Sequence, residues 1–359
     1  MSFADDFAAL ICDWCLGVAP GQQVLVETTT LAQDVAMAMH AAVLARGAWP
    51  LLRLDPPELE ASFYRHAQDR QLDEFAPLGI AEAEAIDSRV LVRAPANTNA
   101  LAGVDPALQA RVARSRLPWL QARSRRHWCL SIWPTPALAQ QARMGNAEYA
   151  EFVQRALFLD QPDPVEAWRS LSERQAAIVS RLSTAREVRI ESDRTDLRLS
   201  VAGRKWVNSD GRYNMPSGEV FTSPLEQSAT GRIRFDVPSS NRAADVSGVE
   251  LTFEDGEVVT ARADLGDEQL QAALATDAGA RRLGELGIGT NTGIDRATGS
   301  TLLDEKIAGT IHLALGRSFP EAGGENQSAL HWDLICDLRS GGRVTVDGEA
   351  LIQDGAFVG

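Results

Sequence analysis

The sequence is poor in cysteine and histidine, the residues that most often carry disulfide, redox or nucleophilic chemistry. Its four cysteines are too few and too scattered for a disulfide framework. Cys12 and Cys15 have redox-motif spacing but lie in an apolar helical pattern, so we expect both to be buried core residues. Neither a Gly-x-Ser-x-Gly motif nor a Cys/His catalytic pairing is visible, which excludes the usual nucleophilic hydrolases.

Long apolar runs and an excess of positive charge are also missing. No stretch approaches the roughly 18 consecutive apolar residues of a membrane-spanning helix. The first residues, MSFADDFAALICDW, carry two aspartates where a secretory signal needs positive charge, so we expect a cytoplasmic protein. The net charge of -14 disfavours nucleic acids and anionic membranes as partners. A neutral or cationic small substrate fits better.

The length of 359 residues predicts two domains. In the first half, apolar strands alternate with helices, an order typical of a parallel sheet covered by helices. A helical stretch from 147 to 183 then gives way to short alternating strands separated by Gly, Asp and Pro turns. We therefore predict an α/β N-terminal domain over residues 1–183 and a β-rich α+β C-terminal domain over residues 184–359.

The individual elements follow from the same periodicities. In the N-terminal domain we expect strands at 23–27, 49–54, 88–93 and 127–132, and helices at 32–46, 81–85 and 105–117. In the C-terminal domain we expect strands at 187–190, 197–201, 233–237, 249–253 and 258–263, and helices at 268–283 and 304–314.

Two of the five histidines lie close together in the C-terminal domain, in segments that also contain acids. The segment from His331 to Ile335 alternates like a strand, so His331 and Asp333 should point to the same side as a two-ligand unit. His312 lies in the apolar segment Thr310–Gly316, which has little reason to accept an imidazole. The alternative for each histidine alone is a core residue that is hydrogen-bonded to the backbone.

Two glutamates complete the candidate set. Glu219 enters an apolar strand directly after a Pro-Ser-Gly turn, where a buried carboxylate needs a cation or hydrogen bonds, unless it is simply exposed at a strand start. Glu285 is likewise flanked by glycines and apolar residues, and we interpret the nearby Gly287-Ile288-Gly289 as a turn beside the site. Two glutamates, one aspartate and two histidines suit one or two divalent cations such as Zn, Co, Mn or Mg.

Five segments of the C-terminal domain together resemble the motif series of the aminopeptidase T/S-type metallopeptidases. They are NMPSGEVFTSP, LGELGIGTN, LLDEKIAGTIHLALG, NQSALHWDLICD and VDGEALIQDG, in that order. The N-terminal segments CLGVAPGQQVLVE, GAWPLLRL and WPTPALAQQARM resemble the same family, so the similarity covers nearly the whole chain.

This resemblance implies a homodimeric aminopeptidase with two divalent metals and a peptide or aminoacyl substrate. The family's ligand motifs fall on Glu219, Glu285, His312, His331 and Asp333, and the resemblance makes Glu219 our first choice for the general base. One position departs, because the family's tyrosine seven residues after the first ligand histidine is Phe319 here. A phenyl ring lacks a hydroxyl for a metal or an oxyanion, and the loss of such a donor costs roughly 100- to 1000-fold in turnover.

Two other functions stay open from the sequence. Some relatives of the family are mononuclear iron dioxygenases that cleave dihydroxypyridine rings, for which His312, His331 and Asp333 would form a facial triad. The retention of Glu219 and Glu285 favours the dinuclear peptidase. The second alternative is a catalytically weakened binding protein in which Phe319 has replaced a catalytic group.

Overall fold

The computed structural model describes residues 2–241 and 244–358, and its packing divides the chain into two units. The first comprises Met1–Trp168 and Gly211–Pro216, and the second comprises Arg169–Asp210 and Ser217–Gly359. The chain passes from the first unit to the second within helix α10 (Pro164–Leu182). The predicted domain boundary near residue 183 stays a prediction, because a division by packing does not show which parts fold separately.

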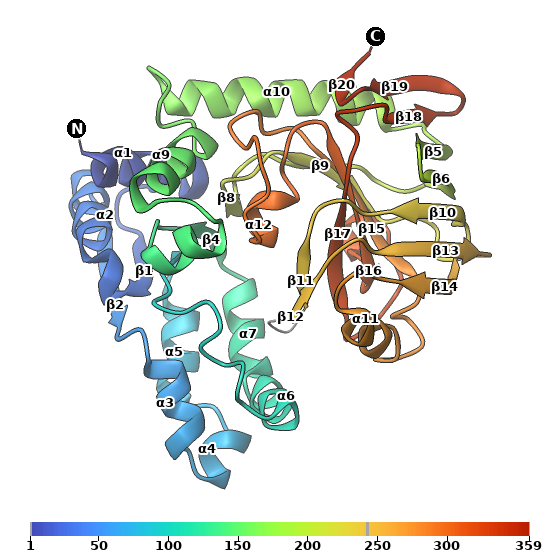
Figure 1. Ribbon diagram of the computed structural model, residues 1–359. Coiled ribbons are helices and arrows are strands. Elements are labelled where there is room, and N and C mark those ends of the chain that lie inside the picture. The colour runs from blue at the N-terminus through green and yellow to red at the C-terminus, as the bar shows by residue number, and fades with distance from the viewer. Residues whose placement is uncertain (1, 242–243, 359) are drawn as a thin grey trace. The chain divides into compact units, whose positions relative to one another are not determined.

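The first unit contains a five-stranded sheet whose paired strands all run parallel, in the order β2-β1-β3-β4-β8. Figure 1 draws residues 1–168 of this unit in blue to green, with helices around strands β1, β2 and β4. Strand β1 has five consecutive buried residues, the pattern of a strand that is covered on both faces of a parallel sheet. Cys12 and Cys15 are buried, as predicted. The strands are β1 (Gln23–Thr29), β2 (Trp49–Asp55), β3 (Ser88–Arg93), β4 (His127–Ile132) and β8 (Asn214–Met215).

Helices connect these strands, so the predicted α/β order of the N-terminal part is confirmed. The α-helices are α1 (Phe3–Leu10), α2 (Gln33–Ala45), α3 (Leu59–His66), α4 (Asp69–Asp73), α5 (Pro77–Ala85), α6 (Pro106–Ser115), α7 (Leu117–Ser124), α8 (Pro136–Gln141) and α9 (Asn146–Ala156). A π-helical segment (Ile11–Leu16) and a 3-10 turn (Thr30–Ala32) complete the set.

The second unit is β-rich and antiparallel, as predicted. An eight-stranded sheet has the order β14-β13-β10-β6-β5-β18-β19-β20, and a five-stranded sheet has the order β17-β16-β15-β9-β7. The eight-stranded sheet consists of β5 (Glu187–Ser192), β6 (Thr195–Ser200), β10 (Thr230–Arg234), β13 (Glu250–Glu254), β14 (Glu257–Arg262), β18 (Arg343–Val346), β19 (Glu349–Gln353) and β20 (Ala356–Phe357). The five-stranded sheet consists of β7 (Val207–Ser209), β9 (Glu219–Thr222), β15 (Leu283–Gly289), β16 (Thr310–Gly316) and β17 (His331–Asp337). The remaining elements are β11 (Ser239–Asn241), β12 (Ala244–Val246), α11 (Asp267–Leu274), α12 (Thr301–Asp304) and a 3-10 turn (Pro320–Ala322).

One hydrophobic core joins the two large sheets of this unit. It contains Val188 and Leu197 from the eight-stranded sheet together with Leu286, Leu313 and Leu334 from the five-stranded sheet. Because side chains alternate along a strand, the residues next to Leu286, Leu313 and Leu334 point to the opposite face of the five-stranded sheet. That second face is free to carry polar groups.

Three local predictions were wrong. The segment 304–314 is not a helix, because Gly309 has a φ of +84° and the residues that follow pair with β15 and β17 as strand β16. Helix α11 ends at Leu274 rather than at 283, where β15 begins. The Gly287-Ile288-Gly289 segment is the end of strand β15 and not a turn. Among the described residues, no helix is both long and apolar enough to cross a membrane.

Candidate metal centre

Strand register brings the predicted ligands onto one face of the five-stranded sheet. Glu219 of β9 lies opposite Gly289 of β15, and His312 of β16 lies opposite Gly287 of β15. Ala314 of β16 lies between Glu285 of β15 and Asp333 of β17, and Gly316 lies opposite His331. Directly opposed residues share a face, and so do residues two apart on a strand. The five side chains therefore project together from four neighbouring strands.

Small residues between the ligands leave room for them. A Cβ atom on Gly287 would lie 2.0 Å from Cε1 of His312, so the imidazole occupies the space that a side chain would fill. Gly284 is equally constrained, since its Cβ would lie 2.3 Å from the carbonyl oxygen of Arg317. The β15–β16 register shifts between Leu283 and Glu285, which lets Leu283 face the core while Glu285 faces the site. The glycines of this segment thus have a steric function.

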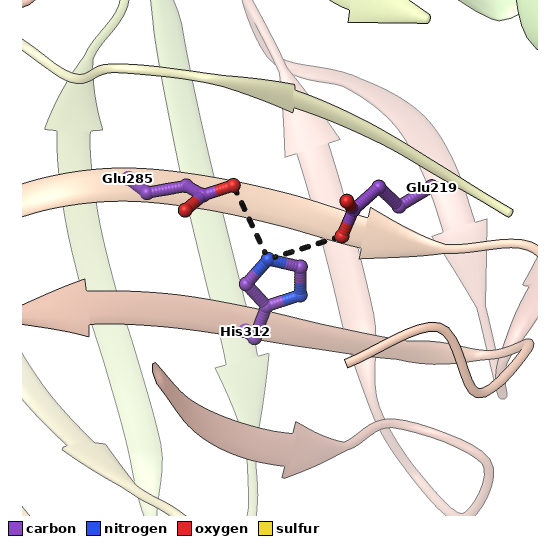
Figure 2. Close-up of side chains that lie close together, drawn as sticks. All are labelled: Glu219, Glu285 and His312. Carbon is purple, nitrogen blue, oxygen red and sulfur yellow. Dashed lines mark ion pairs between the residues drawn. The ribbon is translucent and has the colours of Figure 1, made fainter. Parts of the chain in front are cut away.

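The donor atoms lie at the spacing of ligands around a common cation. Figure 2 shows the carboxylates of Glu219 and Glu285 directed toward Nε2 of His312, each with an oxygen 3.5 Å away. Nε2 of His331 lies 3.4 Å from Oε2 of Glu285 and 3.7 Å from Oδ1 of Asp333. Two atoms that each bind one tetrahedral zinc ion at about 2.0–2.1 Å are about 3.3–3.4 Å apart. These separations are long for hydrogen bonds but suit shared coordination.

Several of these buried donors lack a hydrogen-bond partner. Both ring nitrogens of the fully buried His312, Oε2 of Glu219 and Oδ1 of Asp333 have none among the described residues. Buried polar atoms are rarely left without a partner, because the lost hydration costs about 1–3 kcal/mol for each group. A divalent cation would give Oε2 of Glu219, Oδ1 of Asp333 and one ring nitrogen of His312 a partner, so the residues present fit such an ion.

His331 is oriented by its other ring nitrogen. Nδ1 lies 2.8 Å from the carbonyl oxygen of Arg317. A carbonyl oxygen can only accept a hydrogen bond, so Nδ1 donates, and Nε2 faces Glu285 and Asp333. Metal-binding histidines commonly have this arrangement, in which a backbone carbonyl fixes the ring and its tautomer.

In the metal-free protein, protons would balance the charge of these carboxylates. Burial lowers the pKa of His312, but the carboxylates of Glu285 and Glu219 outweigh burial and raise it to about 10. Burial also opposes protonation of His331, but Glu285 and Asp333 raise its pKa to about 9. Burial raises the pKa of Glu285, yet the two histidines lower it well below its ordinary value. A cation that binds here must therefore displace protons from both imidazoles.

The structure adds two residues that the sequence did not single out. Lys306 is completely buried, and its Nζ lies 2.7 Å from Oε1 of Glu219 and is also paired with the carboxylate of Glu305. A carboxylate oxygen of Glu305 comes within 4.8 Å of donor atoms of His312 and Asp333. The signal in the sequence was a charged Asp-Glu-Lys run between apolar residues of the segment LLDEKIAGTIH.

Phe319, which departs from the family pattern, lies beside the centre. Its ring centroid is 5.2 Å from that of His331, with the two rings nearly perpendicular, and 5.1 Å from that of Phe221. The side chain at position 319 therefore contacts His331, a predicted metal ligand, and a hydroxyl on this ring would lie close to the centre. The ring itself supplies only apolar contact.

The fold and this face of carboxylate and imidazole donors define a metal-dependent enzyme, and comparison with known proteins identifies its family. The profile of the thermophilic metalloproteases (M29) matches residues 3–357. Aminopeptidase 2 of Geobacillus stearothermophilus is 28% identical, and the match covers 96% of this chain and 94% of that protein. Aminopeptidase T of Thermus thermophilus is 29% identical over 77% of this chain and 76% of its own length. The chain belongs to the thermophilic metalloprotease (M29) family, so the resemblance found in the sequence is confirmed.

Solved structures agree with this assignment. Wild-type AmpT from Thermus thermophilus matches with a TM-score of 0.85 and 26% identity, over 99% of each chain. The 2,5-dihydroxypyridine dioxygenase from Pseudomonas putida KT2440 matches with a TM-score of 0.59 and 16% identity over 99% of this chain and 96% of that chain, a likeness that shows the fold alone. Each three-residue group of possible ligands among the described residues contains only one histidine, whereas a facial triad needs two.

Proposed function

We propose that this metallo-aminopeptidase removes the N-terminal residue of peptides with two divalent cations held by Glu219, Glu285, His312, His331 and Asp333. The observation that carries the proposal is the position of Glu285 between two groups of donors. One oxygen of Glu285 faces His312, in the group that includes Glu219, and the other faces His331, in the group that includes Asp333. A carboxylate with one oxygen in each group supports two ions that share Glu285.

The chemistry divides between the ions and the protein. Bound divalent cations lower the pKa of a coordinated water and polarise the scissile carbonyl. We propose that Oε2 of Glu219 binds an ion with one lone pair and accepts the proton of the attacking water with the other, since this buried oxygen has no hydrogen-bond partner and faces the group of donors. The chain's net charge of -14 suits a substrate with a protonated amino terminus. The oxygen and nitrogen donors suit Zn, Co, Mn or Mg.

We further propose that the protein acts as a cytoplasmic homodimer. In the first unit, Trp49 of the edge strand β2 is 67% exposed, and Met37 and Leu44 of the contacting helix α2 are also exposed. Exposed apolar residues that gather on neighbouring elements are typical of a protein interface. Light scattering should give the mass of two chains for the wild type and a lower mass for Trp49→Asp; a monomeric wild type would contradict the proposal.

The proposed cytoplasmic location is supported by the four free, buried cysteines, which suit a reducing compartment.

The role of Glu219 is tested by Glu219→Gln, with the exposed Glu254→Gln of the same unit as a matched control. The amide keeps the size of the side chain but cannot accept the proton. We expect Glu219→Gln to fold, to keep at least part of its metal and to lose hydrolysis of leucine p-nitroanilide, whereas Glu254→Gln keeps full activity. Near-wild-type turnover of Glu219→Gln would show that another group is the base.

A further inference from the structure

Lys306 is unusual both in the chain and in its surroundings. Lys205 and Lys306 are the only lysines, and all other basic residues are arginines. Lys205 is exposed, whereas Lys306 is among the largest fully buried side chains of the protein. Burial of an ammonium group costs several kcal/mol unless nearby charges compensate for it. The burial of a lysine at position 306 therefore suggests that its ammonium group has a specific role in the site.

The contacts of Lys306 divide the two oxygens of Glu219. Nζ lies 2.7 Å from Oε1 of Glu219 and also pairs with the carboxylate of Glu305. The other oxygen of Glu219, Oε2, is buried without a hydrogen-bond partner and lies 3.5 Å from Nε2 of His312. Oε1 thus binds the lysine, and Oε2 is left for the group of ligands.

The backbone holds Lys306 and Glu219 at a fixed separation through one residue. The backbone N–H of Asn291 donates to the carbonyl oxygen of Lys306 at 3.0 Å, and its side-chain amide donates to the carbonyl oxygen of Ser217 at 2.8 Å. Ser217 lies in the turn that leads into Glu219. Gly218 of this turn has a φ of +113°, and a Cβ on it would lie 2.8 Å from Cβ of Asn291. Both partners of the ion pair are therefore anchored to Asn291.

A second anchor holds the segment before Lys306. The buried carboxylate of Asp304 accepts hydrogen bonds from the backbone N–H groups of Thr298 and Gly299, both at 2.8 Å. This closes the loop that leads through helix α12 to Glu305 and Lys306. The segment with Glu305 and Lys306 is thus fixed by hydrogen bonds to Asp304 before it and by the hydrogen bond from Asn291 to Lys306.

Lysine and arginine differ in how they bind a carboxylate. Arginine forms two parallel hydrogen bonds and engages both oxygens, as Arg46 does with Asp13 at 2.7 Å for each bond. A lysine ammonium is a compact charge and can engage a single oxygen. In a chain that otherwise uses arginine, lysine at position 306 leaves the second oxygen of Glu219 available.

We propose that Lys306 is a positioning residue of the metal centre: by binding Oε1 of Glu219, it presents Oε2 alone to the cation of the Glu219–Glu285–His312 group. The inference rests on the proposed function and deepens it. Residues that orient a ligand in this way typically contribute about 10- to 100-fold to metal affinity or activity. Because Lys306 is paired with Glu219 and Glu305, we assign it an effect on the cation through Glu219.

The test is a cobalt titration of the metal-depleted protein, followed by visible absorption. Lys306→Met removes the charge at similar size, and Lys205→Met is the same substitution at the exposed lysine. In Lys306→Met we expect the ion of the Glu219 group to bind at least about 10-fold more weakly with an altered cobalt spectrum, while the ion of the Glu285–His331–Asp333 group binds as before. We also expect kcat to fall with little change in KM, and Lys205→Met to match the wild type.

The double variant Glu305→Gln/Lys306→Met keeps the net charge of the centre and guards against misfolding caused by an unpaired buried carboxylate. It should fold, as judged by circular dichroism, and should show the same weakened cobalt site. Wild-type cobalt affinities and spectrum in a folded Lys306 variant would overturn the proposal, and so would failure of both variants to fold, which would make the lysine purely structural. A wild-type protein that takes up no cobalt would instead refute the proposed function.

Discussion

Gly287→Ala should remove one of the two proposed ions without removing any ligand. The added Cβ would lie 2.0 Å from Cε1 and 2.1 Å from Nε2 of His312, whereas carbon atoms in contact are normally about 3.5–4.0 Å apart. The imidazole must therefore move by about 1.5 Å or the two strands must separate. Coordination distances tolerate only about 0.2 Å, so His312 would no longer reach a cation shared with Glu219 and Glu285.

The expected magnitudes follow from this overlap. Overpacking of a filled site costs about 1–3 kcal/mol of folding free energy, which the metal-free protein should show as a lower unfolding midpoint in denaturant. The metal content should fall from about two ions to about one per chain, because the Glu285–His331–Asp333 group does not include the displaced His312. Activity on leucine p-nitroanilide should be lost together with that ion.

Gly103→Ala is the matched control, since Gly103 is exposed and a Cβ there would meet no atom within 4 Å. Elemental analysis and the activity assay are run on both variants after the same metal loading. If Gly287→Ala keeps two ions and full turnover, His312 either does not sit against Gly287 or does not bind metal, and the reasoning fails.

Three further results are expected. His331→Ala and Asp333→Ala should each lower metal content and the thermal midpoint together, because metal binding contributes to folding free energy; full occupancy in either variant would remove that residue from the centre. Phe319→Tyr should raise kcat by about 10-fold or more with little change in KM, since a new hydroxyl beside His331 would act mainly in the transition state. An unchanged rate with metals loaded would show that another group already donates the hydrogen bond to the transition state. Metal binding should release protons at pH 7 and strengthen as pH rises, because the metal-free pKa values of His312 and His331, about 10 and about 9, both lie above neutrality. Calorimetry in two buffers of different ionisation enthalpy should therefore give different heats of metal binding. Equal heats would contradict the assignment of both histidines as ligands.

The sequence predicted those features of the site that depend on one strand at a time. The two-residue period placed His331 and Asp333 on one side of a strand, and β17 confirms that placement. The pairing of Gly287 with His312 depends on the register of β15 against β16, which no pattern within either segment reveals. The glycines therefore looked like a turn, although they make room for an imidazole.

Tertiary context decided the two remaining differences. The segment 304–314 contains Glu, Lys, Ala and Leu, which favour helix, but pairing with β15 and β17 makes its second half a strand. Glu305 and Lys306 were not singled out in the sequence, because Glu219, the partner that brings Lys306 to the site, is far away along the chain. Charged residues between buried apolar neighbours, such as Leu303 and Ile307, were the available signal.

The central claim is that two cations share Glu285, and the metal content of Glu285→Ala tests it most directly. Wild type and variant are depleted, loaded with the same divalent metal, freed of excess metal and analysed for ions per chain. The account predicts about two ions for the wild type and almost none for Glu285→Ala, because both groups of donors lose a member. A wild type that binds one iron and consumes oxygen, or a Glu285→Ala variant that keeps both ions, would contradict it.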